Sequence, residues 1–151
     1  MYKPTLYYKR TPQQRADKFL SWNRDDTSFF AAGACHILAY QFMELHSINK
    51  KYNIIGLKSV HDTNVHNVFV SDGTWAFDYA GWTLEDELLA ETKMAHTAVN
   101  KDWEYEKVLI TEDLETFCKQ YNHRAPAHFA YLPWERAYKY IKMFDPRPPE
   151  L

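Results

Sequence analysis

The chain has 151 residues, of which 46% are hydrophobic and 17% aromatic, and its formal net charge is −2. This length and composition predict a single well-packed domain over residues 1–151 and exclude a disordered or low-complexity chain. The sequence has no run of lysines and arginines that would attract nucleic acid, and no apolar run long enough to cross a membrane. We therefore expect neither nucleic acid nor a membrane as a partner.

The N-terminal sequence MYKPTLYYKR lacks the apolar centre of a signal peptide. This predicts a protein that is cytoplasmic as synthesised, with export only by a secretion route that needs no signal. Two cysteines are too few for a disulfide scaffold or a four-cysteine zinc site, and the seven histidines show no HExxH spacing. We predict no metal and no cofactor. A weaker alternative is a metal site made by His61, His66 and Asp78.

The first half of the chain alternates helix and strand signals. Residues 11–14 (TPQQ) form a capping box with proline at the first helical position, which predicts a helix to Trp22. Residues 23–28 are polar and predict a turn. Apolar side chains at helical spacing from Cys35 to Leu45 predict a second helix. The sequence NIIGLKSV (53–60) predicts a strand, and residues 66–82 predict a hairpin.

The second half continues the mixed pattern. Expected here are a helix over 84–90 capped by Thr83, a strand over 105–110, a helix ending at Tyr121, a last helix from Pro133 to Phe144, and an exposed Pro-rich tail over 145–151. This order of elements predicts an α+β fold in which a mostly antiparallel sheet packs against helices.

The hairpin places a histidine, His66, and an aspartate, Asp78, on neighbouring strands, and its turn decides whether they meet. A two-residue turn at Asp72-Gly73 would place Asp78 on the opposite face from His66. A three-residue loop over 71–73 would pair them directly, with Cβ atoms about 5 Å apart. We favour the three-residue loop, because it forms a charge-matched pair and gathers the bulky aromatic side chains on the other face.

Cys35 is the candidate nucleophile. Gly33 suits the position just before a helix begins, so Cys35 is expected in the first helical turn. There the unpaired backbone N–H groups would lower the pKa of the thiol and could hold an oxyanion. If the helix instead begins near Ser28, Cys35 is an ordinary apolar side chain. Cys118 lies on a regular apolar stripe and is expected to be structural. We expect no role for His36, which points away from Cys35, or for His123 and His128, which are expected at the surface.

Three ordered motifs carry a family resemblance. They are Gly33-Ala34-Cys35 with Ala39 four residues later, the strand 66–70 (HNVFV) and the segment 75–78 (WAFD). In this order they resemble the transglutaminase-like core of the papain-like thiol enzymes. They also resemble small bacterial and phage proteins with a GGCH segment followed by a His/Asp hairpin. Papain-type proteases place a glutamine six residues before the cysteine, where this chain has Phe29.

The resemblance implies a papain-like core and a Cys35, His66, Asp78 triad. By analogy Cys35 attacks the carbonyl, His66 carries its proton, and Asp78 orients the imidazole. The activity implied is that of a cysteine-dependent hydrolase, an amidase, deamidase or peptidase working through an acyl-enzyme, a class that includes exported bacterial toxins and effectors. Its substrate would be an amide in a protein, a peptide or peptidoglycan.

Three residues near the triad are candidates for substrate binding. Asn67 could supply a side-chain donor, and Tyr79 and Trp82 could line a substrate groove, although either aromatic could equally belong to the core. The alternative function is a non-enzymatic protein-binding domain on the same fold, of the phage or immunity type. A thiol of ordinary reactivity, or a two-residue turn that separates His66 from Asp78, would favour that alternative.

Overall fold

The computed structural model describes residues 1–48 and 51–150 and has an α+β architecture, as predicted. Its sheet has five antiparallel strands in the order β4-β3-β2-β1-β5. The strands are β1 (Asn53–Ser59), β2 (Val65–Ser71), β3 (Trp75–Asp78), β4 (Gly81–Leu84) and β5 (Tyr105–Ile110). The helices are η1 (Thr5–Tyr8), α1 (Pro12–Ala16), α2 (Lys18–Trp22), α3 (Asp26–Ala31), α4 (Cys35–His46), α5 (Glu85–Val99), α6 (Leu114–Tyr121), η2 (Pro126–His128) and α7 (Trp134–Ile141).

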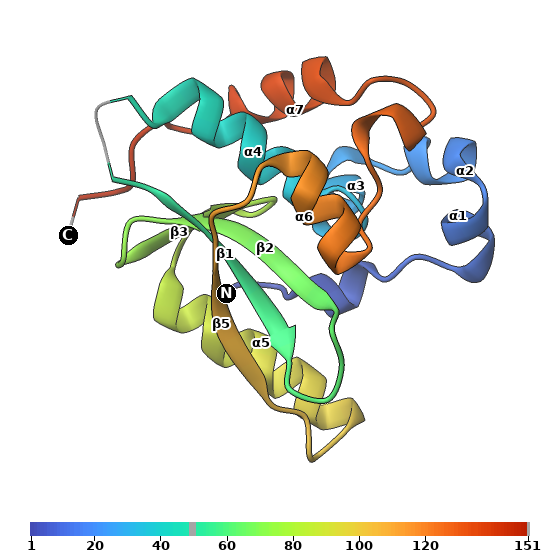
Figure 1. The fold of residues 1–151 in the computed structure, drawn as a ribbon. Helices are drawn as coiled ribbons and strands as arrows, with labels where there is room; N and C mark the ends of the chain where they lie inside the picture. Colours follow the sequence, from blue (N-terminus) through green and yellow to red (C-terminus); the bar gives the residue numbers. More distant parts are fainter. Residues whose placement is uncertain (49–50, 151) are drawn as a thin grey trace.

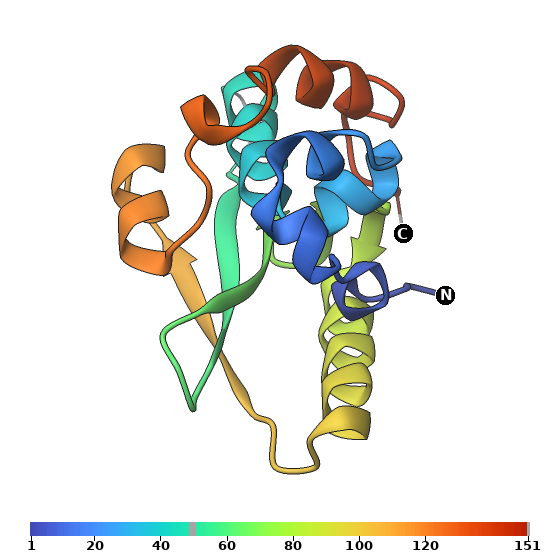
Figure 2. The same ribbon diagram turned by 90° about the vertical axis from the view of Figure 1, so that its right-hand side faces the viewer.

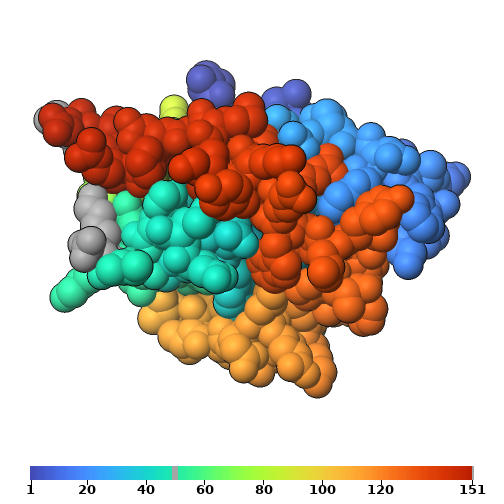
Figure 3. Space-filling view, turned by 90° about the horizontal axis from the view of Figure 1, so that it is seen from above, coloured from blue at the N-terminus to red at the C-terminus, as the bar shows by residue number. Residues whose placement is uncertain are grey.

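Helices cover both faces of the sheet. Helix α4 lies over one face with α7 beside it, and α5 runs along the opposite face (Figures 1 and 2). Phe42 of α4 stacks on Phe77 of β3 with ring centroids 4.4 Å apart. The contact between α3 and α7 includes Phe30 and Tyr140, whose centroids are 5.0 Å apart. Seen from above, α7 and α4 lie side by side across the top of the molecule (Figure 3). The apolar stripe that predicted α4 is therefore buried on the sheet and on α7.

Two helix predictions were wrong in their bounds. The helix expected up to Trp22 is two short helices, because Asp17 leaves the helical conformation (φ −114°, ψ 111°) and its carboxylate caps α2. Thr83 does not cap a helix. It pairs with Ala76 inside β4, a strand that the sequence did not predict, and α5 follows it and continues to Val99. The positive φ of Gly81 (+77°) lets the chain reverse between β3 and β4.

The hairpin register was also predicted wrongly. The structure has a two-residue loop at Gly73-Thr74, closed by the Asp72 N–H donating to the Trp75 carbonyl (3.1 Å). The Asp72 carboxylate fixes this loop, because its Oδ1 accepts from the N–H groups of Thr74 (2.9 Å) and Trp75 (2.7 Å). Neither of the two turns considered from the sequence forms.

The observed register separates His66 from Asp78. Val70 pairs with Phe77 and Ser71 pairs with Ala76. Continuing this pairing would set Asp78 opposite position 69, three residues from His66, or roughly 10 Å along the strand. His66 is in addition the extra residue of an irregularity between β1 and β2, where Leu57 pairs with Asn67 but Lys58 pairs with Val65. Such a bulge turns a side chain away from the regular alternation of the sheet.

The C-terminal segment is exposed over residues 145–150 apart from half-buried Pro148, which agrees with the predicted tail; Leu151 lies outside the described residues. The indole Nε1 of Trp82 donates to the Asp145 carbonyl (2.8 Å) and ties the start of this segment to the sheet. Within residues 1–48 and 51–150, no helix has the length and apolar character needed to span a membrane.

Candidate functional site

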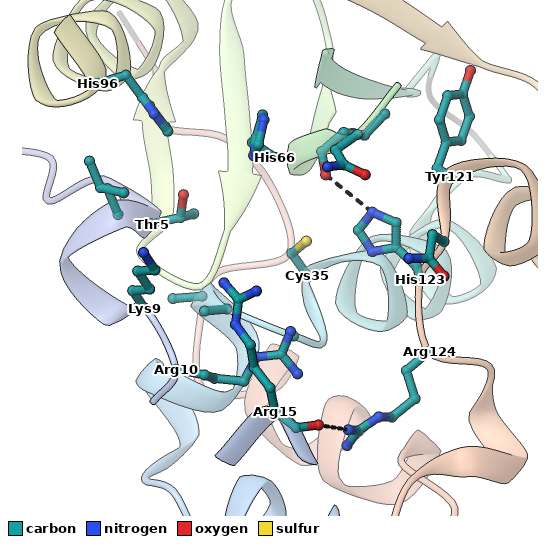
Figure 4. A pocket seen from close by; sticks show the side chains of 17 residues that line it. Thr5, Lys9, Arg10, Arg15, Cys35, His66, His96, Tyr121, His123 and Arg124 are labelled. Atoms are coloured by element: carbon teal, nitrogen blue, oxygen red, sulfur yellow. Dashed lines mark hydrogen bonds between the residues drawn. The ribbon is translucent and has the colours of Figure 1, made fainter. Parts of the chain in front are cut away.

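Cys35 is the first residue of α4, at the position expected from Gly33. Its side chain is buried, and it lines a cavity of about 480 Å³ that it shares with His66 and His123 (Figure 4). The alternative helix start near Ser28 is excluded, because α3 ends at Ala31 and a separate helix begins at Cys35. The helix start and the cavity place the thiol where a small molecule could reach it.

The thiol is not activated in the free protein. Burial, with a smaller contribution from the charge of Asp78, raises the pKa of Cys35 to about 11. The backbone N–H groups of Val68 and His36 favour the thiolate, but they do not outweigh the loss of hydration. The predicted lowering of the thiol pKa was therefore wrong. Cys118 is buried in the hydrophobic core with its Sγ 3.7 Å from the Arg124 carbonyl, as expected of a structural cysteine.

His123 is the first of two imidazoles beside Cys35. It follows α6 in the chain and was expected at the surface, but it is half-buried and lines the cavity. Its Nε2 lies 3.1 Å from the Val65 carbonyl. Burial lowers its pKa to about 4, so the ring is neutral at pH 7. Because a carbonyl only accepts, Nε2 carries the proton and Nδ1 keeps its lone pair. His123 is therefore a neutral base held by the backbone of β2.

His36 is the second imidazole, and it is fully buried. Its Nε2 donates to the Arg124 carbonyl (2.7 Å), and its Nδ1 has no hydrogen-bond partner. Burial, followed by the charge of His123, lowers its pKa to about 3. The sulfur of Cys35 and one ring nitrogen of each of the two histidines lie within 4.8 Å of one another. We assigned no role to either histidine from the sequence, because His36 directly follows Cys35 and His123 lies 87 residues after His36.

This cluster could hold a transition-metal ion. A thiolate and two imidazoles are ligands that zinc binds. The Nε2–H of each imidazole already donates to a backbone carbonyl, and zinc-bound histidines commonly make such a bond with the nitrogen that does not bind the metal. Among the described residues it is the one group of three such side chains close enough to share an ion. The alternative set of His61, His66 and Asp78 is not gathered, because the His61 Nε2 bonds the Asp102 carbonyl and Asp78 lies in another network.

Zinc is expected to protect Cys35 from alkylation. In a Cys118→Ser background, excess Zn²⁺ should slow the reaction of Cys35 with iodoacetamide at pH 8, because the metal occupies the sulfur lone pair. The His36→Ala variant should lose this protection. Intact-mass spectrometry over time measures the alkylated fraction. Equal rates with and without zinc in the parent protein would contradict the cluster's capacity to hold the ion.

His66 lines the same cavity, but its side chain contacts other residues than Cys35 and His123 do. Its Nε2 lies 3.7 Å from the Oδ2 of Asp62, and its ring is 5.7 Å from the ring of His96. It does not pair with Asp78, because the hairpin register differs from the one expected. In Figure 4 the His66 ring lies on the cavity wall above Cys35. The structure thus brings Cys35 and His66 to one cavity without assembling the three predicted residues into a triad.

Asp78 lies in a buried network beside the thiol. Its Oδ2 accepts from the hydroxyl of Tyr2 (2.7 Å), and its Oδ1 accepts from the N–H of Ala80 (2.9 Å). Burial raises the pKa of Asp78 to about 7, against the lowering effect of these two bonds. The carboxylate is close enough to raise the pKa of Cys35, but no hydrogen bond joins it to an imidazole among the described residues.

The three residues predicted to bind substrate lie outside this cavity. Asn67 is buried and its Nδ2 donates to the Tyr2 hydroxyl (3.5 Å), while its Oδ1 has no partner. Tyr79 is buried and its hydroxyl donates to the same Tyr2 oxygen (2.9 Å). Trp82 packs edge-on against Phe77 and, with Tyr79, lines a separate hollow. Asn67 and Tyr79 are therefore part of the packing around Tyr2.

The arrangement joins a buried thiol, a neutral imidazole with a free lone pair and the start of a helix in one cavity. Such a set can move a proton from sulfur to nitrogen while the sulfur attacks an electrophilic carbon. The N–H groups at the start of α4 can then donate to a carbonyl oxygen and stabilise the negative charge that develops on it. Comparisons with protein-family models, with curated proteins and with solved structures find no match for this chain.

Proposed function

We propose that this protein is a cysteine-dependent hydrolase that cleaves an amide or an ester through an acyl-enzyme on Cys35. The observation that carries the proposal is the position of Cys35. Cys35 is the first residue of α4 and lines a cavity of about 480 Å³. Its sulfur lies within 4.8 Å of a ring nitrogen of His123. Amidase, deamidase and peptidase chemistry all use this step, and a role as an exported effector is compatible with each of them.

The proposed first step moves one proton and forms one bond. The Cys35 thiol gives its proton to Nδ1 of His123 as the sulfur attacks the carbonyl carbon, and the C–S bond forms. The carbonyl oxygen takes the negative charge and accepts hydrogen bonds from N–H groups at the start of α4. His123 then protonates the leaving nitrogen or oxygen, and water hydrolyses the thioester. The Val65 carbonyl holds the imidazole in the required tautomer.

The resemblance to a papain-like or transglutaminase-like core fits this proposal in its general plan. A helix that begins with the cysteine packs on an antiparallel sheet, and the next strands carry a histidine and an aspartate. The detailed roles differ from those that the resemblance implies. His123 is the better-placed base, Asp78 bonds Tyr2, and the carboxylate beside His66 belongs to Asp62.

The test is to trap the acyl-enzyme. Protein carrying Cys118→Ser is mixed with p-nitrophenyl acetate, quenched in acid at short times and analysed by peptide mass spectrometry. The expected result is one acetyl group on Cys35, with a burst of p-nitrophenol that Cys35→Ala lacks. If Cys35 stays unmodified while p-nitrophenol release equals that of the alanine variant, the hydrolase proposal is rejected. The non-enzymatic binding domain would then be the better description.

A further inference from the structure

One wall of the Cys35 cavity is strongly basic. Its cationic side chains come from the segment after η1, from α1 and from the loop after α6, and they are Lys9, Arg10, Arg15 and Arg124 (Figure 4). Among the described residues that line the cavity there is no aspartate or glutamate. The protein as a whole has a net charge of −2, so this concentration of positive charge is local and not a consequence of composition.

Among the residues that the structure describes, these four cations have no ion-pair partner. Burial lowers the pKa of Arg10, and the neighbouring charges of Arg124 and Arg15 lower it further. Arg124 donates from Nη2 to the Arg15 carbonyl (3.1 Å), but its Nη1 is buried without a partner. An unsatisfied buried donor on a charged group is costly, and a bound anion would satisfy it.

The basic wall packs closely against the segment that leads to Cys35. Gly33 has a φ of +113°, and a Cβ built on it would lie 3.2 Å from Cζ and Nη1 of Arg10. The guanidinium therefore occupies the space that a side chain at position 33 would need, two residues before Cys35. The charge of Arg10 also favours the thiolate form of Cys35. The basic wall and the Cys35 thiol thus face the same cavity.

We propose that the ligand of this cavity is a small organic anion, whose carboxylate or phosphate is held by Arg10, Arg15 and Arg124 while its acyl carbon reaches Cys35. The second half of this statement rests on the proposed hydrolase function, and the first half does not. Guanidinium groups bind carboxylates and phosphates through two parallel hydrogen bonds. A cavity of about 480 Å³ is of the size that small-molecule ligands occupy.

The first experiment measures binding without turnover. Cys35→Ser protein is titrated at low ionic strength with glutarate and, separately, with inorganic phosphate, in an isothermal calorimeter. At least one of the two should bind, and Arg124→Gln should weaken that binding roughly tenfold or more, as expected for the loss of a charge-assisted pair. Arg147→Gln, which removes an exposed arginine outside this cavity, should leave it unchanged. The tighter ligand identifies the carboxylate or the phosphate as the group recognised.

The second experiment measures preference during turnover. The wild type is compared on p-nitrophenyl acetate and on the mono-p-nitrophenyl ester of glutarate, which adds a carboxylate to the acyl chain. We expect kcat/KM to favour the anionic ester by roughly tenfold or more and Arg124→Gln to abolish the preference. Arg15→Gln, a change at an exposed side chain that should not disturb folding, should reduce the same preference.

The outcomes separate the two proposals. Anion binding without cleavage of either ester would support the basic wall and reject the hydrolase. Equal cleavage of both esters, with no binding of either anion, would overturn the anion inference and leave the hydrolase standing. Equal binding by Cys35→Ser with and without Arg124→Gln would also overturn it, because the anion would then bind elsewhere.

Discussion

Replacing His123 with alanine is expected to lower kcat/KM on an activated ester by roughly 10²- to 10⁴-fold, the usual contribution of a general base. The reason is that its Nδ1 is the proton acceptor proposed for Cys35, whose sulfur lies within 4.8 Å of a ring nitrogen of His123. His123→Gln keeps a side chain of similar reach that cannot accept a full proton, and it should be nearly as impaired. Initial rates of p-nitrophenol release, with circular dichroism to check folding, measure the effect.

His66→Ala is the matched comparison for His123→Ala. Both side chains line the same cavity, but His66 lies beside Asp62 and the ring of His96, so its loss should lower kcat/KM by less than about tenfold. The pH dependence of the wild-type rate is a second test of which histidine is the base. Burial lowers the pKa of His123 to about 4, so the rate should hold at pH 5 and fall only near pH 4, where the base becomes protonated. A larger loss in His66→Ala than in His123→Ala would return the role of base to His66.

The sequence predicted the part of the site that depends on local structure. Gly33 and the apolar stripe after it placed the start of a helix at Cys35, and the helix begins there. Turn residues and alternating apolar residues placed a hairpin after position 65, and β2 and β3 form it. The signals were sufficient because each of these features is decided by residues within a few positions of one another.

The features that were predicted wrongly depend either on one side chain within the turn or on contacts between residues far apart in the sequence. The hairpin register follows from the Asp72 carboxylate accepting two backbone N–H groups, a choice that turn propensities do not separate. His123 reaches Cys35 because the loop after α6 returns to β2, where the Val65 carbonyl binds it. No local pattern marks such a long-range contact. The thiol pKa was predicted in the wrong direction, because burial outweighs the helix start and burial is a property of the whole fold.

Asp78 makes the stability of the fold depend on pH. Its folded-state pKa is raised to about 7 by burial, above the ordinary value of 3.8 for an aspartate. The folded protein therefore prefers the protonated carboxyl, and this contribution to stability is fully present below about pH 4. It is lost as the pH rises through about 7, because the unfolded chain ionises freely while the folded chain must hold a buried charge. The expected loss between pH 5 and pH 8 is of the order of a few kcal/mol.

The Asp78→Asn variant should remove this dependence, because the amide cannot ionise. Its oxygen can keep the bond from the Ala80 N–H, while its NH2 group takes the place of Oδ2 and can donate to the Tyr2 hydroxyl oxygen. The measurement is the free energy of unfolding in urea at pH 5, 6, 7 and 8 for the wild type and the variant. The difference between the two should move steadily in favour of asparagine as the pH rises, while the titration of the two buried histidines affects both proteins equally and cancels.

Asp25→Asn is the matched control. Backbone hydrogen bonding from Ser28 lowers the pKa of Asp25, so its contribution changes only in acid and its difference should stay flat from pH 5 to pH 8. Parallel curves for wild type and Asp78→Asn would mean that Asp78 is ionised throughout this range. The carboxylate would then be a fixed negative charge opposing thiolate formation at Cys35, and Arg10 would be left to balance it.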